Sequence, residues 1–157
     1  TYSGNIKVLS STNKLILKGN TKDSKIMGKY KFYHKNGKVM AILNYSNNEI
    51  QGLQKLFHDN SKLYASYDIK DYQLKYLQRF YKNGSLLEKG SFKNGFIDGI
   101  WSYKIQSKDS ETEKILLDNP RAEKHFRNGY FIYNIKYTQN KNNSCRQSLC
   151  IKGDILK

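Results

Sequence analysis

The sequence predicts an all-β fold, a single-layer antiparallel β-meander of stacked hairpin repeats about 23 residues long. Asparagine recurs at intervals of 23, 24 and 23 residues, at Asn13, Asn36, Asn60 and Asn83. A second turn signal follows about half a period later, as at Asn47-Asn48 and Asn94-Gly95. A unit this small cannot bury its apolar face alone, so each period predicts two strands and two turns that stack on the next.

The individual elements follow from turn chemistry. Two-residue hairpin turns need positive backbone φ, which Asn and Gly tolerate, so the recurrent Asn positions predict turns. The best-kept copies are residues 32–38 and 80–85, with a weaker one at 57–62. Between turns the residues alternate in the manner of strands, as in 38–45 and 86–92. A helix is disfavoured because Asn, Gly and β-forming residues interrupt every window.

The same period resumes late in the chain. Asn128-Gly129 lies 45 residues beyond Asn83-Gly84, close to two periods, so one degenerate repeat is expected between them. Aromatic residues keep the phase, because each falls nine residues after an asparagine of the series: Tyr45, Phe92 and Tyr137 after Asn36, Asn83 and Asn128.

Residues 92–103, with the sequence FKNGFIDGIWSY, resemble the MORN-type repeat, particularly the bacterial variant known as the YwqK-like antitoxin family. The resemblance covers residues 28–104 and is faint in 1–27 and 121–140. Asn60-Ser61 departs from the Asn-Gly pattern, and Tyr76 stands where the other copies have Gly52 and Gly99. The resemblance implies an open antiparallel β-meander without enzymatic activity, which binds a protein partner or, in eukaryotic relatives, associates with membranes.

The expected organisation is a single domain over 1–157, with the best repeats at 28–104, an insertion at 105–120, and a degenerate repeat with a cysteine-containing segment at 121–157. In the insertion, Ser110 and Glu113 have capping-box spacing, which predicts a short helix over 111–117 that Pro120 ends. The insertion is locally acidic. It is interpreted either as part of a binding face, through Glu111 and Glu113, or as a tolerated surface loop.

The net charge of +15 lies at the two ends of the chain. Residues 1–40 have nine Lys and only Asp23 as an acid (9 − 1 = +8), residues 41–120 have eleven basic and ten acidic residues (+1), and residues 121–157 have eight and two (+6). Amphipathic strands and an AT-rich coding bias explain this pattern, and a patch for a protein, membrane or nucleic acid is the alternative. Nucleic acid is disfavoured because the chain has only four Arg.

The search for catalytic, cofactor and metal sites yields no candidate, so an enzyme is not expected. His34 and His58 occupy one repeat position, but equivalent positions lie about 10 Å apart, whereas two zinc ligands need nitrogens within about 4 Å. Tyr81 takes the same position in the third copy, which indicates a polar or aromatic strand position. Asp68 and Asp71 fall at an expected turn, where Asp is favoured.

Cys145 and Cys150 are five residues apart, and the spacing predicts a disulfide that closes a small loop. Two reduced thiols are the alternative, and a zinc site would need further ligands beyond His125. A disulfide favours an extracytoplasmic protein, in the periplasm, at the cell surface or secreted, with the cytoplasm as the alternative. The chain opens on Thr1 rather than Met, which suggests that a leader was removed, and no apolar run approaches the roughly 18 residues of a membrane span.

Three functions follow. The first is a protein-binding module of antitoxin or immunity type that blocks a toxin through exposed aromatic anchors, together with Glu111 and Glu113 of the insertion. Those anchors are Tyr33, Tyr45, Trp101 and Tyr103. The second is an envelope or surface protein that binds anionic lipid or polysaccharide through its basic ends. The third is a nucleic-acid binder. The sequence favours the first, and no small-molecule substrate is expected.

Overall fold

The computed structural model describes the backbone of residues 1–104, 121–139 and 145–150. The chain divides into two compact units, Thr1–Ser85 and Leu86–Lys157, and each is described by itself. This division does not coincide with the boundaries expected at 28, 105 and 121, and the single-domain organisation stays a prediction. The predicted helix over 111–117 lies outside the described residues.

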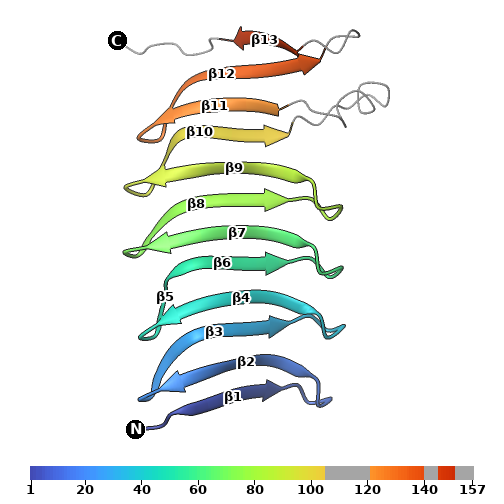
Figure 1. Cartoon of the computed structure of the whole chain (residues 1–157), viewed down its shortest axis with the longest axis vertical. Helices are drawn as coiled ribbons and strands as arrows, with labels where there is room; N and C mark the ends of the chain where they lie inside the picture. The colour runs from blue at the N-terminus through green and yellow to red at the C-terminus, as the bar shows by residue number, and fades with distance from the viewer. Residues whose placement is uncertain (105–120, 140–144, 151–157) are drawn as a thin grey trace. The chain divides into compact units, whose positions relative to one another are not determined.

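Unit 1 is an antiparallel meander in which strands follow one another in chain order (Figure 1). Its strands are β1 (Gly4–Leu9), β2 (Leu15–Lys22), β3 (Lys25–Tyr33), β4 (Val39–Ser46), β5 (Glu49–Ile50), β6 (Gly52–Phe57), β7 (Leu63–Lys70) and β8 (Gln73–Phe80). The two-residue β5 pairs with the end of β4, and β6 pairs with both β4 and β7. The predicted all-β meander with two strands in each period is confirmed.

Unit 2 repeats the pattern. Its strands are β9 (Leu86–Lys93), β10 (Phe96–Lys104), β11 (Arg121–Arg127), β12 (Tyr130–Gln139) and β13 (Cys145–Cys150). Each pairs antiparallel with its successor, and β10 meets β11 in unbroken register from Gly99–Phe126 to Lys104–Arg121. Asn128-Gly129 does form a turn, between β11 and β12, but it is the counterpart of Asn94-Gly95 between β9 and β10, with positive φ at both residues, and not of Asn83-Gly84. The prediction that it continues the Asn83 series after one degenerate repeat is therefore wrong.

The turns are of two kinds, and in unit 1 the two kinds lie at opposite ends of the strands (Figure 1). One series uses two-residue loops in which both residues have positive φ, as the predicted hairpin turns require. This series comprises Asp23-Ser24, Asn47-Asn48, Asp71-Tyr72, Asn94-Gly95 and Asn128-Gly129. Asp71 is thus a turn residue as expected, whereas Asp68 lies within β7.

The recurrent asparagines that define the period belong to the other series, and their role differs from the prediction. In the loop after β3, Gly37 N donates to His34 O at 2.9 Å, and the positive φ (80°) falls on Gly37, one residue after Asn36. The same holds at Ser61 after Asn60 and at Gly84 after Asn83. These are three-residue loops with a glycine-type bulge, so Asn36, Asn60 and Asn83 do not need the left-handed conformation, whereas Asn13 itself adopts it, with a φ of 58°.

Two of these asparagines, Asn36 and Asn60, contribute a hydrogen bond to the next repeat. The Asn36 side chain accepts from Lys38 N at 3.0 Å and donates to Asp59 O, 23 residues on, at 2.9 Å. Asn60 does the same with Lys62 N and with Lys82 O, at 3.0 and 2.8 Å. Asn36 and Asn60 therefore each close their own turn and also tie that turn to the next one, and Asn83 closes its turn by accepting from Ser85 N.

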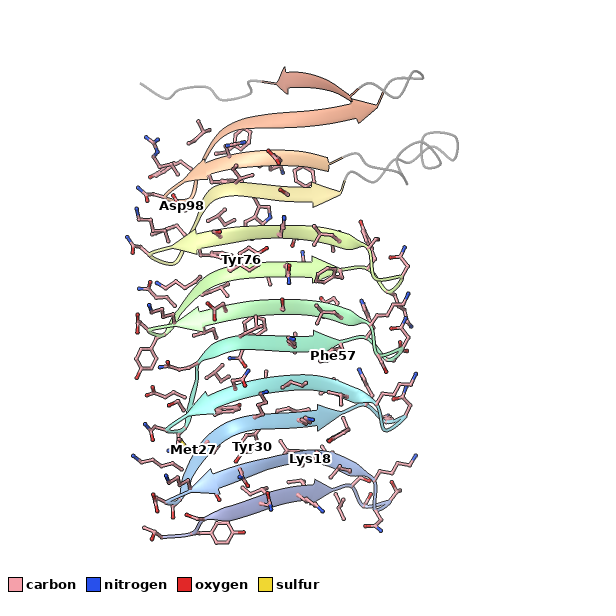
Figure 2. The ribbon with its side chains drawn as sticks, in the orientation of Figure 1. Lys18, Met27, Tyr30, Phe57, Tyr76 and Asp98 are labelled. Atoms are coloured by element: carbon pink, nitrogen blue, oxygen red, sulfur yellow. The ribbon has the colours of Figure 1, made fainter. Side chains whose placement is uncertain are left out.

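The core of each unit is a thin line of buried residues within a single sheet. In unit 1, Tyr30 on β3 (Figure 2) is 4% exposed; its ring lies against Gly19, and its hydroxyl donates to Asn20 O at 2.7 Å. Gln54 is fully buried, and its side chain both accepts from Asn44 N and donates to Gln51 O. Bulky residues set against small ones fill a layer that has no second sheet to cover it.

Candidate binding surfaces

The two predicted anchors of unit 1 are half-buried and lie in different surroundings. Tyr45 packs edge-on against Tyr30, with ring centroids 5.2 Å apart. Tyr33 ends β3, and Lys18 Nζ lies 5.9 Å from the centre of its ring. Tyr45 therefore supports the core, whereas Tyr33 belongs to a lysine-rich surface.

The predicted anchors of unit 2 require a correction. Trp101 is only 9% exposed, because its ring lies against Gly90 and meets the Phe92 ring edge-on with centroids 5.3 Å apart. The expectation that Trp101 leads an exposed aromatic surface is wrong, since this residue is core. Tyr103 is half-buried, and Lys124 Nζ lies 4.9 Å from its ring centre.

Other predicted residues fall at the limits of the described chain. Glu111 and Glu113 lie outside the described residues, so their role stays a prediction. Cys145 and Cys150 are the two end residues of β13. Five steps along an extended strand span about 16 Å, whereas a disulfide needs Cα atoms within about 7 Å. The predicted disulfide is not compatible with this strand, and the mass of the unreduced, alkylated protein decides whether it forms.

One exposed surface is a pair of neighbouring turns in unit 2, which we call the turn patch: Asn94, Phe96, Asn128, Gly129 and Tyr130. Phe96 is 57% exposed and Tyr130 78% exposed. Together the five residues line a hollow of about 550 Å³. Large aromatic side chains that remain in water beside a hollow are typical of sites where another molecule binds.

Backbone contacts hold the turn patch in place. Gly129 N donates to Ile97 O at 2.8 Å, and Asn128 N donates to the Asp98 carboxylate at 2.9 Å. A Cβ on Gly129 would lie 3.1 Å from Phe96 Cδ1, so the Phe96 ring rests against the glycine. This contact restricts the Phe96 ring on one side before any partner arrives, and such restriction lowers the entropic cost of binding.

The rim of the turn patch carries two cations, and the Asp98 carboxylate beside it accepts a hydrogen bond from Asn128 N. Lys93 pairs with Phe96 across the turn between β9 and β10, and Arg127 pairs with Tyr130 across the turn between β11 and β12. An apolar centre with a cationic rim favours a protein surface with an apolar centre and acidic residues around it.

The sequence contains a signal for the turn patch, although neither Phe96 nor Tyr130 is among the predicted anchors. In both copies an aromatic residue follows directly on Asn-Gly, as Asn94-Gly95-Phe96 and Asn128-Gly129-Tyr130. The first residue after a two-residue turn flanks the loop, where a large side chain stays exposed. Trp101 was predicted as an anchor from its residue type, and its burial depends on a contact with Gly90 that the sequence does not indicate.

Two of the three histidines, His34 and His58, have a structural role. His34 Nε2 donates to Phe57 O at 2.9 Å, and His58 Nε2 donates to Phe80 O at 3.1 Å, which repeats the contact one period later. Because a carbonyl can only accept, the Nε2 atom of each ring must carry a proton. Within the described residues there is no group of three metal-ligating side chains and no helix long and apolar enough to span a membrane.

Comparison with known families agrees with the architecture. Residues 28–47 and 76–94 match the MORN repeat variant. The first matched segment includes most of β3 and β4, and the second includes most of β8 and β9. Repeats of this kind generally serve as modules that bind proteins or membranes. No curated protein matches the chain significantly.

Proposed function

We propose that this chain, with two segments matching the MORN repeat variant, is a non-enzymatic protein-binding module of antitoxin or immunity type. In this proposal the turn patch of unit 2 docks on a toxin and blocks its working surface. The observation that supports it is the exposure of Phe96 and Tyr130 on two turns that hydrogen bonds hold together. Aromatic residues dominate the energetics of protein interfaces, and ordered ones bind at the lowest entropic cost.

The charge of the rim indicates what kind of protein surface the partner should present. Lys93 and Arg127 flank the aromatic pair, so the partner should present acidic residues around an apolar centre. Rim charges mainly raise the rate of association and are screened by salt, whereas the apolar centre sets how long the complex lasts. Binding should therefore persist at moderate ionic strength.

The first test is a pull-down from source-cell extract and culture medium, washed at about 0.15 M and then about 0.5 M salt. We expect one stoichiometric protein to survive the second wash. That protein is then purified and its affinity measured for the wild-type chain and for the double variant Phe96→Ala/Tyr130→Ala. Removing two interface aromatics should weaken binding by at least about 100-fold.

A matched control separates the turn patch from aromatic exposure in general. Tyr72 is 76% exposed and belongs to the same series of turns, but in unit 1. Tyr72→Ala should leave the affinity unchanged. If lipid, polysaccharide or nucleic acid alone is recovered, and is lost at the higher salt, the protein-binding proposal fails.

Two further measurements address the finer parts of the proposal. If the captured protein is a toxin, its expression alone should inhibit growth, and co-expression of this chain should restore growth. If the captured protein alone causes no growth defect, the immunity role is ruled out. Deletion of residues 106–120 tests Glu111 and Glu113. Unchanged affinity after deletion would confine the binding site to the repeats. Export from the cytoplasm stays a prediction that fractionation of source cells checks.

A further inference from the structure

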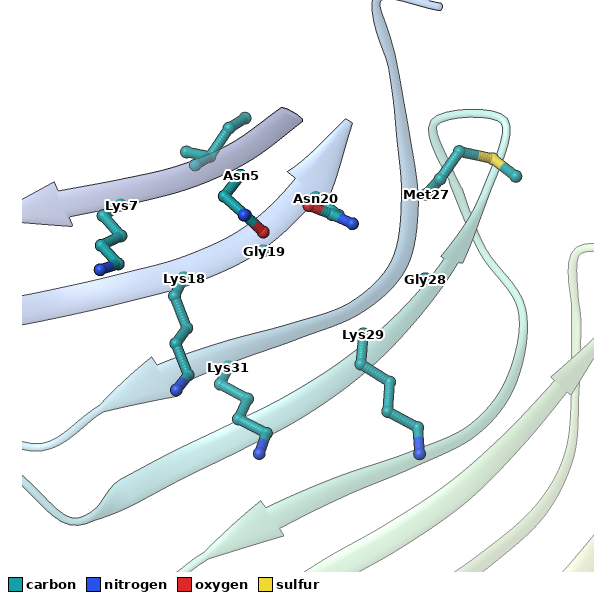
Figure 3. Close-up of a pocket in the computed structure, with 10 residues that line it drawn as sticks. Asn5, Lys7, Lys18, Gly19, Asn20, Met27, Gly28, Lys29 and Lys31 are labelled. Atoms are coloured by element: carbon teal, nitrogen blue, oxygen red, sulfur yellow. The ribbon is translucent and has the colours of Figure 1, made fainter. Parts of the chain in front are cut away.

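A groove on unit 1 combines four lysines that the proposed function does not use. It lies over β1, β2 and β3 and has a volume of about 460 Å³ (Figure 3). The lysines come from all three strands: Lys7, Lys18, Lys29 and Lys31. Their side chains point to the same side of the sheet in Figure 3. We call this set the lysine groove.

Sheet register explains how the lysines meet. Lys7 pairs with Lys18 across β1 and β2, and Lys18 pairs with Lys31 across β2 and β3. Paired residues of an antiparallel sheet share a face, and neighbouring strands are about 4.8 Å apart. Three ammonium groups therefore form a row across three strands. Lys29, two residues before Lys31, adds a fourth to the same face.

Repulsion between the ammonium groups of this row destabilises the folded sheet unless nearby negative charge offsets it. Like charges directly opposite each other in a sheet are destabilising, and Lys18 has a lysine on both sides. Among the ten residues that line the groove, none is acidic. The groove therefore offers concentrated positive charge to an anion from outside.

The lining also indicates which anion fits. The polar lining residues besides lysine are Asn5 and Asn20, which pair with each other and can donate amide hydrogens. The groove has no arginine, whose planar fork binds carboxylates and phosphates in a bidentate geometry, so its cations are all lysine ammonium groups. Lysine ammonium groups act as compact point charges that suit phosphate oxygens. A hollow of this size accommodates a small molecule or a head group.

We propose that the lysine groove binds a compact group carrying two or more phosphates, either free or displayed on a lipid. The ammonium groups of Lys7, Lys18 and Lys31 contact the phosphate oxygens, and the Asn5 and Asn20 amides donate further hydrogen bonds. Tyr33, whose ring lies near Lys18, borders the groove at the end of β3. This site is on unit 1 and is independent of the turn patch on unit 2.

The test is calorimetric titration with sodium tripolyphosphate at about 0.15 M salt. The informative variant is Lys18→Gln/Lys31→Gln, and the charge-matched control is Lys38→Gln/Lys70→Gln, whose lysines are exposed and outside the groove. We expect the groove variant to lose affinity by at least tenfold, since each charge-assisted contact is worth about tenfold or more, and the control to lose less than about threefold.

Folding of the groove variant can be verified independently. Lys18 is exposed, and removing its repulsion should leave the melting temperature equal to or above that of the wild type at low salt. Tripolyphosphate should raise the melting temperature of the wild type and of the control but not that of the groove variant. An equal rise in all three proteins would overturn the proposal.

Two more probes identify the source of the phosphates and test specificity. Vesicles with phosphatidylinositol bisphosphate, compared with phosphatidylserine vesicles of equal charge, distinguish a lipid head group from a free oligophosphate. If the wild type binds one of the two phosphate probes and the groove variant does not, the site is supported, and the probe that binds shows whether the phosphates belong to a lipid or to a free molecule. Poly-glutamate binding as tightly as tripolyphosphate at equal total charge, or equal losses in the groove and control variants, would reduce the groove to non-specific electrostatics and refute the proposal.

Discussion

Trp101 lies against Gly90, and a side chain on Gly90 would overlap the Trp101 ring. The same relationship joins Tyr30 to Gly19 in unit 1, also over a separation of eleven residues. In a single sheet an aromatic residue has no second layer to bury it. A glycine on the neighbouring strand supplies the missing space, so the glycine and the aromatic act as one packing unit.

Gly90→Ala should lower the free energy of unfolding by about 1–3 kcal/mol, because even one methyl group overfills this position. Urea denaturation measures the change. In a Trp101→Ala background the same substitution should cost close to nothing, since the ring that it meets is gone. Equal costs in both backgrounds would show that the penalty arises elsewhere than in this contact.

Ser61→Gly should stabilise the chain by about 0.5–1 kcal/mol, because Ser61 has a φ of 70°, which costs an L-residue energy that glycine avoids. The equivalent residue one period later is Gly84, with a φ of 93°. Gly84→Ser should destabilise by a similar amount, since its nearest neighbour, Lys62, is only in ordinary contact at 3.4 Å. Urea midpoints that move in the same direction for both variants would contradict this account.

The asparagine contacts between repeats can be separated from the closing of the turn. Asn60→Asp keeps the acceptor for Lys62 N but removes the donor to Lys82 O, whereas Asn60→Ala removes both. We expect losses of about 1 kcal/mol for the first variant and more for the second, measured by urea unfolding at about 0.5 M salt to screen the new charge. If Asn60→Asp is as stable as the wild type, the hydrogen bond from Asn60 to the next repeat does not stabilise the chain.

The buried hydroxyl of Tyr30 predicts a dependence on alkaline pH. Burial raises the pKa of Tyr30 above its ordinary value of 10.0, with a smaller contribution from Tyr45. The folded chain therefore holds this proton more tightly than the unfolded chain. The resulting stability is fully present below pH 10 and is lost as the pH rises through the folded pKa.

Tyr30→Phe is the variant that tests this dependence. It removes the hydroxyl that donates to Asn20 O, so it should cost about 1 kcal/mol at neutral pH. The difference in unfolding free energy between wild type and variant should shrink above pH 10. Burial also raises the pKa of Tyr67, so Tyr67→Phe serves as a comparison at a second position. A constant difference for Tyr30→Phe would refute the assignment.

The candidate sites were predicted less well than the fold. Tyr33 was named from the sequence and borders the lysine groove, but Trp101 proved to be buried and Tyr45 supports the core. Phe96 and Tyr130 were missed, although both follow Asn-Gly directly. The lysine row was treated as a solvated face because the pairing of Lys7, Lys18 and Lys31 depends on strand register. Imperfect alternation left that register open.

The sequence by itself determined the period, the two turns in each repeat and the antiparallel meander, because these follow from turn-forming residues that recur in each repeat. Only the tertiary structure decided which side chains are buried and which charges meet. Burial of Trp101 depends on Gly90 of the neighbouring strand, and the hydrogen bond that Asn36 donates depends on the Asp59 carbonyl, 23 residues away. Such contacts arise from pairing between strands, and in a sheet of one layer pairing alone sets both the core and the surface.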